Sequence, residues 1–553
     1  MENKGEPHEL IGLVHVGELV GEMGFLTKAK RSLSVKAIEK TTLMEISEKD
    51  FFYLVKIEPS SIYEILLQVI KRKQKLLEKR VREHRKFIIV LQANRNFDFS
   101  SFKDKIFQLN NKNDLLQLSE EVLIKSYREK GLLKTIDYIT GLDYKHKSII
   151  YFLDYNKFDE YIELNQLLIT LSSSVMFLVD GTEEPTFFQG IFSKVIPSKL
   201  ININKTTINK FLVLCWNNCK EIKGTQRWKD KGHFTSHFHV MTDDDESYKR
   251  LIRFWSGKSI GLVLGAGATR CWTHIGVIKA LQEKNIPIDF IAGSSSGAGV
   301  AATYMLNNDI NELIKINKEI SNAMKATVSI PSLTTIYTSI YNPAKMIKCL
   351  QGLFGYKHIE DLVIPYLSVS YDINNNQEIV HRSGLLWKSI LASCSIPFFL
   401  PPVTKDDSVL IDGGVINTVP VNHLKDIYGI DLKIIASDLD TIHTKKVKYR
   451  FIANRGLMDV VKSKVIGKKR NYVAPGMFTI FMKSMMAGSM NQYQVNMKNA
   501  DYKISHKLRE FDFFEFDDEV HKKMIEIGYN NTLNLLKESD ILIKDIKKNL
   551  PKI

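Results

Sequence analysis

One serine in the sequence is placed as a nucleophile would be. An apolar segment at residues 288–292 leads into Gly293-Ser294-Ser295-Ser296-Gly297, and a run of small residues follows. This G-x-S-x-G pattern predicts a tight turn between a strand and a helix, in which Gly293 and Gly297 leave room for the backbone. Ser295 would then present its hydroxyl at a helix N-terminus, where an activated serine can attack a carbonyl carbon.

Two further segments could complete such a site. An apolar strand opens into the small-residue loop Gly265–Arg270, whose backbone N–H groups could stabilise a developing oxyanion, although a plain packing turn would look the same. A second strand ends at Asp412, and Gly413 and Gly414 then reverse the chain. That carboxylate could accept the serine proton if the fold brings the two together, although Asp-Gly turns are also common in loops.

In this order, the three segments resemble the patatin-like phospholipase family, and residues 392–403 (ASCSIPFFLPPV) resemble the family's segment before the aspartate. The resemblance implies a three-layer α/β/α lipase domain and a Ser–Asp dyad without a catalytic histidine. Ser295 would attack the ester carbonyl, Asp412 would take its proton, and water would hydrolyse the acyl-enzyme. It also implies a structural His274, no metal or organic cofactor, and an oxyanion hole at Gly267, Ala268, Thr269 and Arg270.

The oxyanion loop departs from the family pattern Gly-Gly-Gly-x-Arg-Gly, because it reads Ala266-Gly-Ala-Thr-Arg-Cys271. Alanine still supplies an N–H group, but it resists φ > 0 at a cost of about 1 kcal/mol or more. Two hypotheses follow. The first is a carboxylic ester hydrolase acting on phospholipids or lysophospholipids, and the retained Ser295, Asp412 and Arg270 favour it. The alternative is a catalytically impaired lipid-binding or regulatory protein.

The closer resemblance is to the neuropathy target esterase branch, and it covers nearly the entire chain. In that branch a cyclic-nucleotide-binding-like domain and an α/β linker region precede the lipase domain. Residues 17–35 resemble its phosphate-binding cassette, on which Glu22 would meet the ribose, and Arg31 with Ser32 the cyclic phosphate. Lys30 and Leu33 depart from the cassette, and sixteen residues precede it. We therefore expect a partial β-roll that does not bind cyclic nucleotide, rather than a cyclic-nucleotide-gated regulator.

The pattern of apolar and polar residues places these motifs in a multidomain α/β chain. After residue 86, apolar strands alternate with polar helices, which favours a mostly parallel sheet. The strands predicted there lie at residues 87–92, 149–153, 174–179 and 209–215, and a later strand and helix at 432–436 and 519–537. The expected organisation is a partial β-roll with a basic helix (1–85), an α/β intermediate domain (86–256), the patatin-like catalytic domain (257–425) and a C-terminal extension packing on it (426–553).

The formal charge of +15 favours an anionic partner. Basic clusters at residues 71–86 and 445–470 could hold an anionic membrane at about 1 kcal/mol per residue, and a solvated helix and loop are the alternative. No zinc-spaced Cys/His set or RNA-binding signature is present, so we expect a lipid surface and no nucleic acid. Five scattered cysteines, no signal-peptide core and no apolar run of about 18 residues predict a cytoplasmic protein, peripheral at a membrane.

Overall fold

The structure is a computed structural model of the chain, which separates into two compact units, residues 1–85 and 86–553. It describes residues 42–47, 49–50, 53, 86–93, 97–110, 115–143, 148–195, 208–329, 338–429, 431–439, 484, 487–508 and 510–538. Several predictions fall outside these described residues: nearly all of the expected partial β-roll with its basic helix, the cassette residues Glu22, Arg31 and Ser32, and nearly all of both basic clusters. The second unit carries all three of the predicted catalytic motifs.

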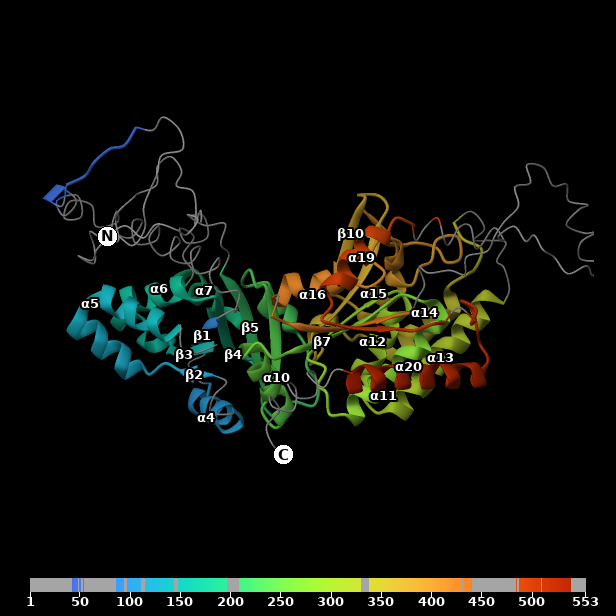
Figure 1. The fold of residues 1–553 in the computed structure, drawn as a ribbon, viewed down its shortest axis with the longest axis horizontal. Helices are drawn as coiled ribbons and strands as arrows, with labels where there is room; N and C mark the ends of the chain where they lie inside the picture. The colour runs from blue at the N-terminus through green and yellow to red at the C-terminus, as the bar shows by residue number, and fades with distance from the viewer. Residues whose placement is uncertain are drawn as a thin grey trace, which may run out of the picture. The chain divides into compact units, whose positions relative to one another are not determined.

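The first sheet of this unit is wholly parallel, with the strand order β2-β3-β1-β4-β5-β6 (Figure 1). Its strands are β1 (Lys86–Gln92), β2 (Leu116–Gln117), β3 (Ser148–Asp154), β4 (Ser174–Asp180), β5 (Asn209–Trp216) and β6 (Ser236–Met241). Most are buried along nearly their whole length, because helices cover both faces of a parallel sheet, and they therefore read as continuous apolar runs. The four predicted strands are confirmed as β1, β3, β4 and β5.

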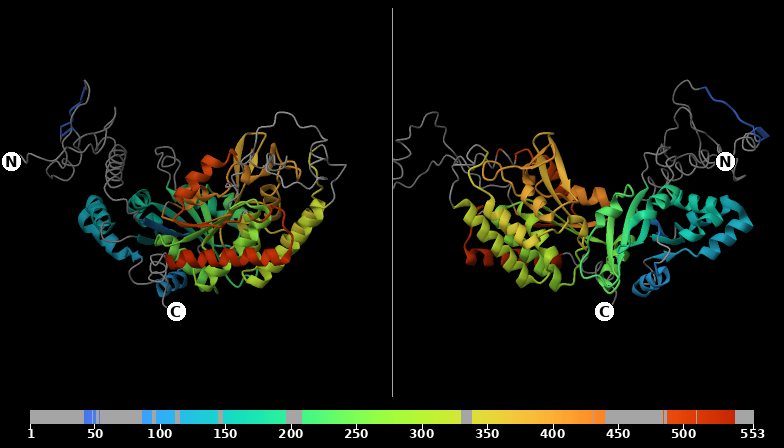
Figure 2. Two further views of the ribbon diagram at one scale, coloured as in Figure 1. Left: turned by 45° about the vertical axis from the view of Figure 1, so that its right-hand side comes forward. Right: turned by 180° about the vertical axis from the view of Figure 1, so that it is seen from behind.

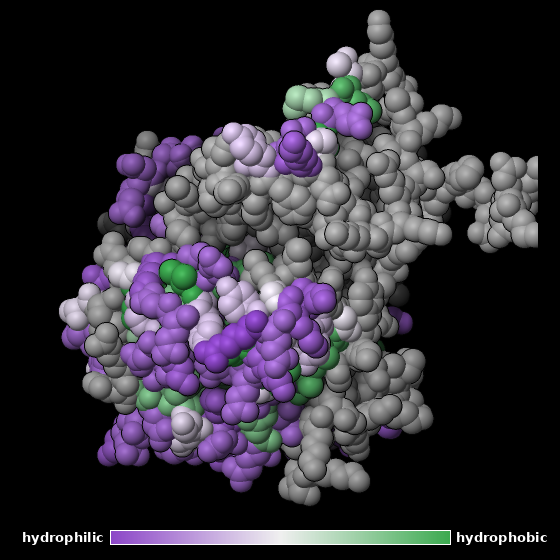
Figure 3. All heavy atoms as spheres, turned by 90° about the vertical axis from the view of Figure 1, so that its left-hand side faces the viewer, coloured by the Kyte–Doolittle hydropathy of each residue, from purple (hydrophilic) through white to green (hydrophobic). Residues whose placement is uncertain are grey.

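Helices connect these strands, and the last of them, α10, leads into the second sheet. They are α4 (Phe99–Leu109), α5 (Glu120–Asp143), α6 (Ile162–Leu171), α7 (Phe188–Val195), α9 (Thr225–Lys229) and α10 (Asp245–Trp255). Figure 3 shows one end of the molecule, where the described residues are mostly hydrophilic and apolar residues form only small separate groups. The described part of that face therefore carries no broad apolar surface of the kind that marks a protein partner.

The second sheet has eight strands in the order β11-β12-β9-β8-β7-β13-β14, with β10 paired to β9. Strands β7, β8, β9, β13 and β14 are parallel to one another, whereas β10, β11 and β12 run antiparallel to their neighbours. The bounds are β7 (Ile260–Leu264), β8 (Phe290–Ser294), β9 (Tyr366–Asp372), β10 (Gln377–His381), β11 (Val403–Lys405), β12 (Ser408–Asp412), β13 (Lys433–Asp438) and β14 (Tyr502–Ser505). Both sheets together confirm the predicted α/β class.

Helices cover both faces of the second sheet, as the three-layer expectation requires. Alternate strand residues point to opposite faces: Val263 and Ile434 pack with α16 (Val421–Tyr428) and α19 (Met490–Asn499). Leu262 and Ile435 pack on the opposite side, and the helices on the two faces can be followed in Figures 1 and 2. The helices on that opposite side are α11 (Trp272–Glu283), α12 (Ser296–Leu306), α13 (Ile310–Val328), α14 (Ala344–Phe354), α15 (Leu386–Ser393) and α20 (Asp518–Glu538).

Residues after 425 complete this sheet as well as packing on it. Strand β13 pairs with β7, and β14 continues the sheet beyond it, so the predicted strand at 432–436 is internal. Helix α20 lies directly on α11 at two glycines. A Cβ atom on Gly276 would overlap the carbonyl oxygen of Ile525, and one on Gly528 would overlap that of Thr273. The glycines thus let the two helix backbones touch, which joins the C-terminal helix to the helix that follows the oxyanion loop.

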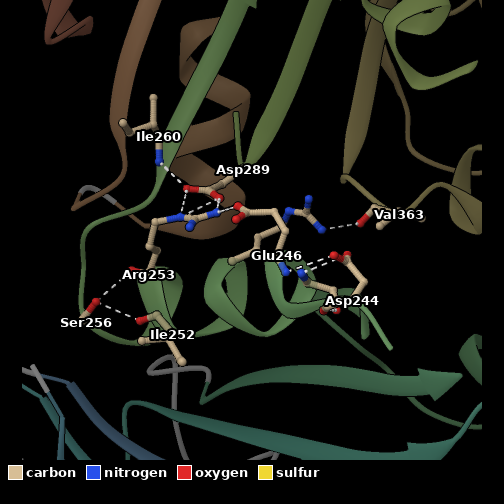
Figure 4. A network of polar contacts seen from close by, with 10 residues as sticks. Asp244, Glu246, Ile252, Arg253, Ser256, Ile260, Asp289 and Val363 are labelled. Atoms are coloured by element: carbon tan, nitrogen blue, oxygen red, sulfur yellow. Dashed lines mark hydrogen bonds and ion pairs between the residues drawn. The ribbon is translucent and has the colours of Figure 1, made fainter. Parts of the chain in front are cut away.

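A buried ion pair fixes the start of the strand that leads to Ser295 (Figure 4). Asp289 precedes β8 and is completely buried. The Nε atom of Arg253, on α10, donates to its two carboxylate oxygens at 3.0 and 3.1 Å, and the backbone N–H of Ile260 donates to Oδ2 at 3.0 Å. Because Ile260 begins β7 and Asp289 directly precedes β8, one carboxylate aligns the starts of two of the three strands that carry the site motifs.

Candidate active site

Ser295 lies in the strand–turn–helix geometry that the G-x-S-x-G pattern predicts. Strand β8 ends at Ser294, α12 begins at Ser296, and Ser295 between them has φ 52° and ψ −128°. A Cβ atom on Gly293 would overlap the backbone of Ala298, and one on Gly297 would overlap the carbonyl oxygen of Leu264. Both flanking glycines are therefore required by close backbone contacts, and the strained serine presents its side chain at the N-terminus of α12.

Asp412 lies at the end of β12 and meets Ser295, although 117 residues separate them in the chain. The Ser295 hydroxyl donates to Oδ2 of Asp412 at 2.6 Å, and the N–H of Gly414 donates to Oδ1 at 2.7 Å. Burial raises the pKa of Asp412 to about 7, against the opposing effect of these two hydrogen bonds. Near neutral pH the protonated and ionised forms of Asp412 are consequently present in similar amounts, which suits a general base.

The segment at residues 392–403 holds the backbone of both residues. The N–H of Ser295 donates to the Ser393 hydroxyl at 2.9 Å, and the N–H of Asp412 donates to the carbonyl oxygen of Ser395 at 3.0 Å. The family resemblance singled out this segment, but the sequence did not indicate which of its residues would bind the pair. Since the Ser295 amide is occupied by Ser393, it does not serve as an oxyanion donor in this arrangement.

The loop between β7 and α11 brings the four predicted oxyanion residues next to the elbow. Two of these four residues already donate their amides within the protein: Thr269 to the carbonyl oxygen of Phe513 at 3.0 Å, and Arg270 to that of Gly267 at 3.1 Å. Within the part of the chain that the structure describes, no hydrogen bond is recorded for the N–H of Gly267 or Ala268. Ala268 has φ 50°, so its backbone is in the left-handed region that alanine resists.

The side chain of Arg270 binds within the protein and does not act as a donor to substrate. Its Nη2 and Nε atoms donate to the carbonyl oxygen of Phe511 at 2.7 and 3.2 Å, and its guanidinium lies 4.3 Å from the centre of the Phe513 ring. The arginine thereby clamps the C-terminal segment 511–516 onto the oxyanion loop. Sequence reasoning missed this segment, although its aromatic run, FDFFEF, was the signal available.

An aromatic cluster lies beside the site. Phe399 stacks on Phe514 with ring centres 5.3 Å apart, and Tyr341 lies 5.8 Å from Phe399. The neighbouring Phe398 is 48% exposed and has φ 73°, which is a strained conformation for a bulky residue. Aromatic side chains from three separate segments of the sequence thus meet next to the segment that binds the backbone of Ser295 and Asp412.

His274 is fully buried and takes no part in the Ser295–Asp412 contact. Its Nε2 atom lies 2.8 Å from the carbonyl oxygen of Gly265, and its Nδ1 atom lies 2.9 Å from the Ser437 hydroxyl. Burial lowers its pKa to about 4, so the ring is neutral at neutral pH. These contacts fit the structural role that the resemblance implies. Among the described residues, no cluster of three or more His, Cys, Asp or Glu side chains is arranged to hold a metal ion.

The comparisons with known proteins match the region that carries this geometry. Residues 262–425 match the family model for patatin-like phospholipase. Lysophospholipase NTE1 of Yarrowia lipolytica is 24% identical over 497 residues, covering 75% of this chain and 34% of that protein. Neuropathy target esterase sws of Drosophila persimilis is 38% identical over 176 residues (31% of this chain, 12% of that protein). Human patatin-like phospholipase domain-containing protein 6 is 34% identical over 188 residues (34% and 14%).

Residues 262–425 are therefore similar to patatin-like phospholipase domains, and the chain is similar to proteins named as neuropathy target esterases and as a lysophospholipase. The chain spans about a third or less of the length of each of these relatives. None of the helices in the described residues is both long enough and apolar enough to cross a membrane.

Proposed function

We propose that this chain is a serine-dependent hydrolase of lipid carboxylic esters, with phospholipids or lysophospholipids as substrates. The 2.6 Å hydrogen bond from Ser295 to the buried carboxylate of Asp412 is the observation that carries the proposal. A serine hydroxyl becomes a useful nucleophile when an adjacent base can take its proton, and a carboxyl with a pKa of about 7 is such a base. The similarity to proteins named as a lysophospholipase and as phospholipase-domain proteins supports lipid esters as the substrate class.

The reaction proceeds in two halves. In the first, Asp412 accepts the proton of Ser295 as its Oγ attacks the ester carbonyl, and a tetrahedral oxyanion forms. Collapse of this intermediate expels the alcohol, which takes the proton back from Asp412 and leaves an acyl group on Ser295. In the second, Asp412 accepts a proton from a water molecule that attacks the acyl-enzyme, and the fatty acid leaves as Ser295 regains its proton.

Gly267 and Ala268 supply the oxyanion donors in this mechanism. Their N–H groups are the two in the predicted set that the described residues do not already engage, and one well-placed donor contributes about 3 kcal/mol to stabilising the transition state. Thr269 and Arg270 hold the loop in place through Phe511 and Phe513. The N-terminus of α12 adds a partial positive charge beside the reacting atoms.

A second candidate, a catalytically impaired lipid-binding protein, draws on the left-handed backbone of Ala268. In that case the strained alanine aims its N–H away from the oxyanion, and Ser295 remains unreactive although lipid still binds. For either candidate the net charge of +15 supports an anionic lipid surface as the place of action.

A fluorophosphonate probe distinguishes the two candidates, because it reacts only with an activated serine. We expect the probe to label Ser295 in the purified chain, identified by mass spectrometry of the modified peptide. Ser295→Ala should abolish labelling and ester hydrolysis together. Ser329→Ala, which removes an exposed hydroxyl at the end of α13, is the matched control and should leave both unchanged.

Two outcomes would count against the enzyme. Attachment of the probe to a different serine, with full turnover by Ser295→Ala, would overturn the assignment of the nucleophile. A folded wild-type chain that binds lipid vesicles but leaves the probe unreacted would favour the impaired lipid-binding protein.

A further inference from the structure

A chain of polar side chains, three of them fully buried and the fourth half-buried, connects helix α20 to the loop that begins at Gly265. Asn531 on α20 lies with its Nδ2 atom 3.0 Å from Nδ1 of His506, whose Nε2 atom is 3.1 Å from the Ser437 hydroxyl. Ser437 in turn lies 2.9 Å from Nδ1 of His274, and Nε2 of His274 lies 2.8 Å from the carbonyl oxygen of Gly265. The four side chains come from four places: Asn531 from α20, His506 from the residue after β14, Ser437 from β13 and His274 from α11. Together they form a continuous chain of hydrogen bonds to Gly265, the first residue of the loop.

The partners fix the direction of every hydrogen bond in this chain, which we call the relay. The carbonyl oxygen of Gly265 can only accept, so Nε2 of His274 carries the hydrogen. Burial lowers the pKa of His274 to about 4 and that of His506 to about 3, and the nearby His274 adds to the lowering at His506. Both rings are therefore neutral at neutral pH, and Nδ1 of His274 must accept from the hydroxyl of Ser437.

The same elimination continues to α20. The single hydrogen of the Ser437 hydroxyl is committed to His274, so Nε2 of His506 must donate to Ser437. Nδ1 of His506 then accepts, and Asn531 must present its NH₂ group to it. Every member donates toward Gly265, and successive bonds aligned in this way strengthen one another in a low-dielectric interior.

We propose that His274, Ser437, His506 and Asn531 are positioning residues for the oxyanion hole. Gly265 is held at both ends, since its N–H donates to the carbonyl oxygen of Ser437 at 3.0 Å and its carbonyl oxygen accepts from His274. Gly267 and Ala268 follow two and three residues later, so the orientation of Gly265 sets the path of the amides that meet the oxyanion. This proposal rests on the proposed function.

The relay places part of the active-site support outside the matched family region. Ser437, His506 and Asn531 all follow residue 425, the last residue of the match. They reach the loop because β13 pairs with β7 and α20 packs on α11. The C-terminal part of the chain then influences catalysis without contacting substrate, and removing one of its polar groups should slow turnover more than it weakens substrate binding.

The tautomers of the two histidines test the relay without reference to activity. In the intact chain labelled with ¹⁵N-histidine, long-range ¹⁵N–¹H correlation near pH 7.5 should show His274 and His506 both as neutral Nε2–H tautomers, assigned through His274→Gln and His506→Gln. An Nδ1–H tautomer or a doubly protonated ring at either position would overturn the relay. This result stands even if the wild-type chain proves inactive, which would be a failure of the proposed function alone.

Two matched variants on α20 test the consequence for catalysis. Asn531→Leu removes the donor to His506, whereas Asn530→Leu makes the same change at an exposed neighbouring position. For Asn531→Leu we expect kcat to fall about ten-fold, with KM within about two-fold of the wild type. The effect is smaller than the loss of an oxyanion donor itself, because the relay only orients the residues that carry those donors. Asn530→Leu should match the wild type. Equal kcat values for the two folded variants would overturn the proposal.

Two substitutions of His506 separate hydrogen bonding from packing, and they also serve if Asn531→Leu does not fold. Gln can donate toward Ser437 and accept from Asn531, so His506→Gln should keep kcat within about three-fold of the wild type. His506→Leu keeps an apolar side chain of similar bulk, and its kcat should fall about ten-fold, with slower fluorophosphonate labelling of Ser295. If the leucine variant equals or exceeds the glutamine variant, His506 contributes packing alone and the relay is wrong.

Discussion

Both sheets contain strands that end in an aspartate, and a comparison of Asp180 with Asp412 is instructive because only Asp412 meets a distant nucleophile. Asp180 ends β4, and its Oδ1 accepts from the N–H and the hydroxyl of Thr182 at 2.9 and 2.6 Å. Asp412 caps its own turn in the same way, through Gly414, but its second oxygen accepts from Ser295. The local turn therefore does not distinguish a candidate base. The distinguishing features are the burial of the carboxylate and the partner of its second oxygen.

The same contrast appears in the backbone. In the described residues of the first sheet region, φ is positive only at Gly131, Gly224 and Asn218, which are residue types that adopt this conformation readily. In the second region, positive φ also occurs at Ala268, Ser295 and Phe398, which lie in or beside the candidate site, and at Asp406, in the turn between β11 and β12. Such positions cost about 1–3 kcal/mol each and persist where the surrounding structure holds them, as the site's close glycine contacts and hydrogen bonds do here.

The largest expected effect comes from neutralising one aspartate of the compared pair. Asp412→Asn should lower kcat by about 10³-fold, because an amide cannot accept the proton of Ser295. The fold should survive, since the asparagine oxygen can still accept from Gly414. Asp180→Asn, the matched control from the first sheet, should leave kcat unchanged. Steady-state kinetics on one ester substrate, with circular dichroism of each variant, provides the measurement.

Two results would contradict this distinction. An Asp180→Asn variant that is folded yet as slow as Asp412→Asn would mean that the first sheet contributes to the chemistry. Near-normal turnover by Asp412→Asn would show that the mechanism does not need the carboxylate. Separately, a folded histidine variant as inactive as Ser295→Ala would indicate a triad.

The contact between Ser295 and Asp412 could be predicted from the sequence better than its surroundings, for physical reasons. Glycines around Ser295 and Asp412 are required by local backbone contacts, so they leave a readable pattern. The strand β6 was missed because its histidines, His237 and His239, interrupt the apolar run. Both are buried nonetheless, each within 2.8 Å of the carbonyl oxygen of Glu360. Ser393 and His506 act through contacts between distant segments, and nothing in their local sequence predicts such contacts.

The pKa of Asp412 predicts a second difference between the regions, which appears in the pH dependence. Because burial raises this pKa to about 7, kcat/KM should fall as pH decreases through 7, by about ten-fold per unit and about 100-fold at pH 5. His274 and His506, with pKa values lowered to about 4 and about 3, titrate below this range. The profile should be measured between pH 5 and 9. A rate that stays constant down to pH 5 would exclude Asp412 as the base.

The titration of Asp412 should affect stability in the opposite direction. As pH rises towards 7, kcat/KM should increase, whereas the free energy of unfolding should decrease. The pKa of Asp412 rises from 3.8 in an unperturbed carboxyl to about 7 in the fold, so the folded chain binds more protons than the unfolded chain between these values. The contribution of Asp412 to the free energy of unfolding is therefore fully present below pH 4 and is lost as pH rises to 7. Denaturant unfolding at pH 5 and pH 8 should show Asp412→Asn gaining stability relative to the wild type at the higher pH.

The smallest expected effect concerns the strained alanine of the oxyanion loop. Ala268 has φ 50°, and the exposed Asn285, at the end of α11, has a similar φ of 54°, so glycine can be placed at both positions as a matched pair. At each position glycine relieves about 1 kcal/mol of backbone strain, but it also makes the unfolded chain more flexible at a similar cost. The melting temperatures of both variants should therefore stay near that of the wild type, and kcat becomes the informative quantity.

If the methyl group of Ala268 turns its N–H away from the oxyanion, Ala268→Gly should raise kcat about ten-fold, within the range that one oxyanion donor commands, and Asn285→Gly should leave it unchanged. A rise in both variants would point to a general loosening of α11 rather than to the hole. A flat kcat in Ala268→Gly, with Ser295 equally reactive toward the probe in both proteins, would refute the strained-loop account. The contacts that fix Gly265, Thr269 and Arg270 would then already hold the amide in its working direction, and alanine would be a tolerated substitute for the family's glycine.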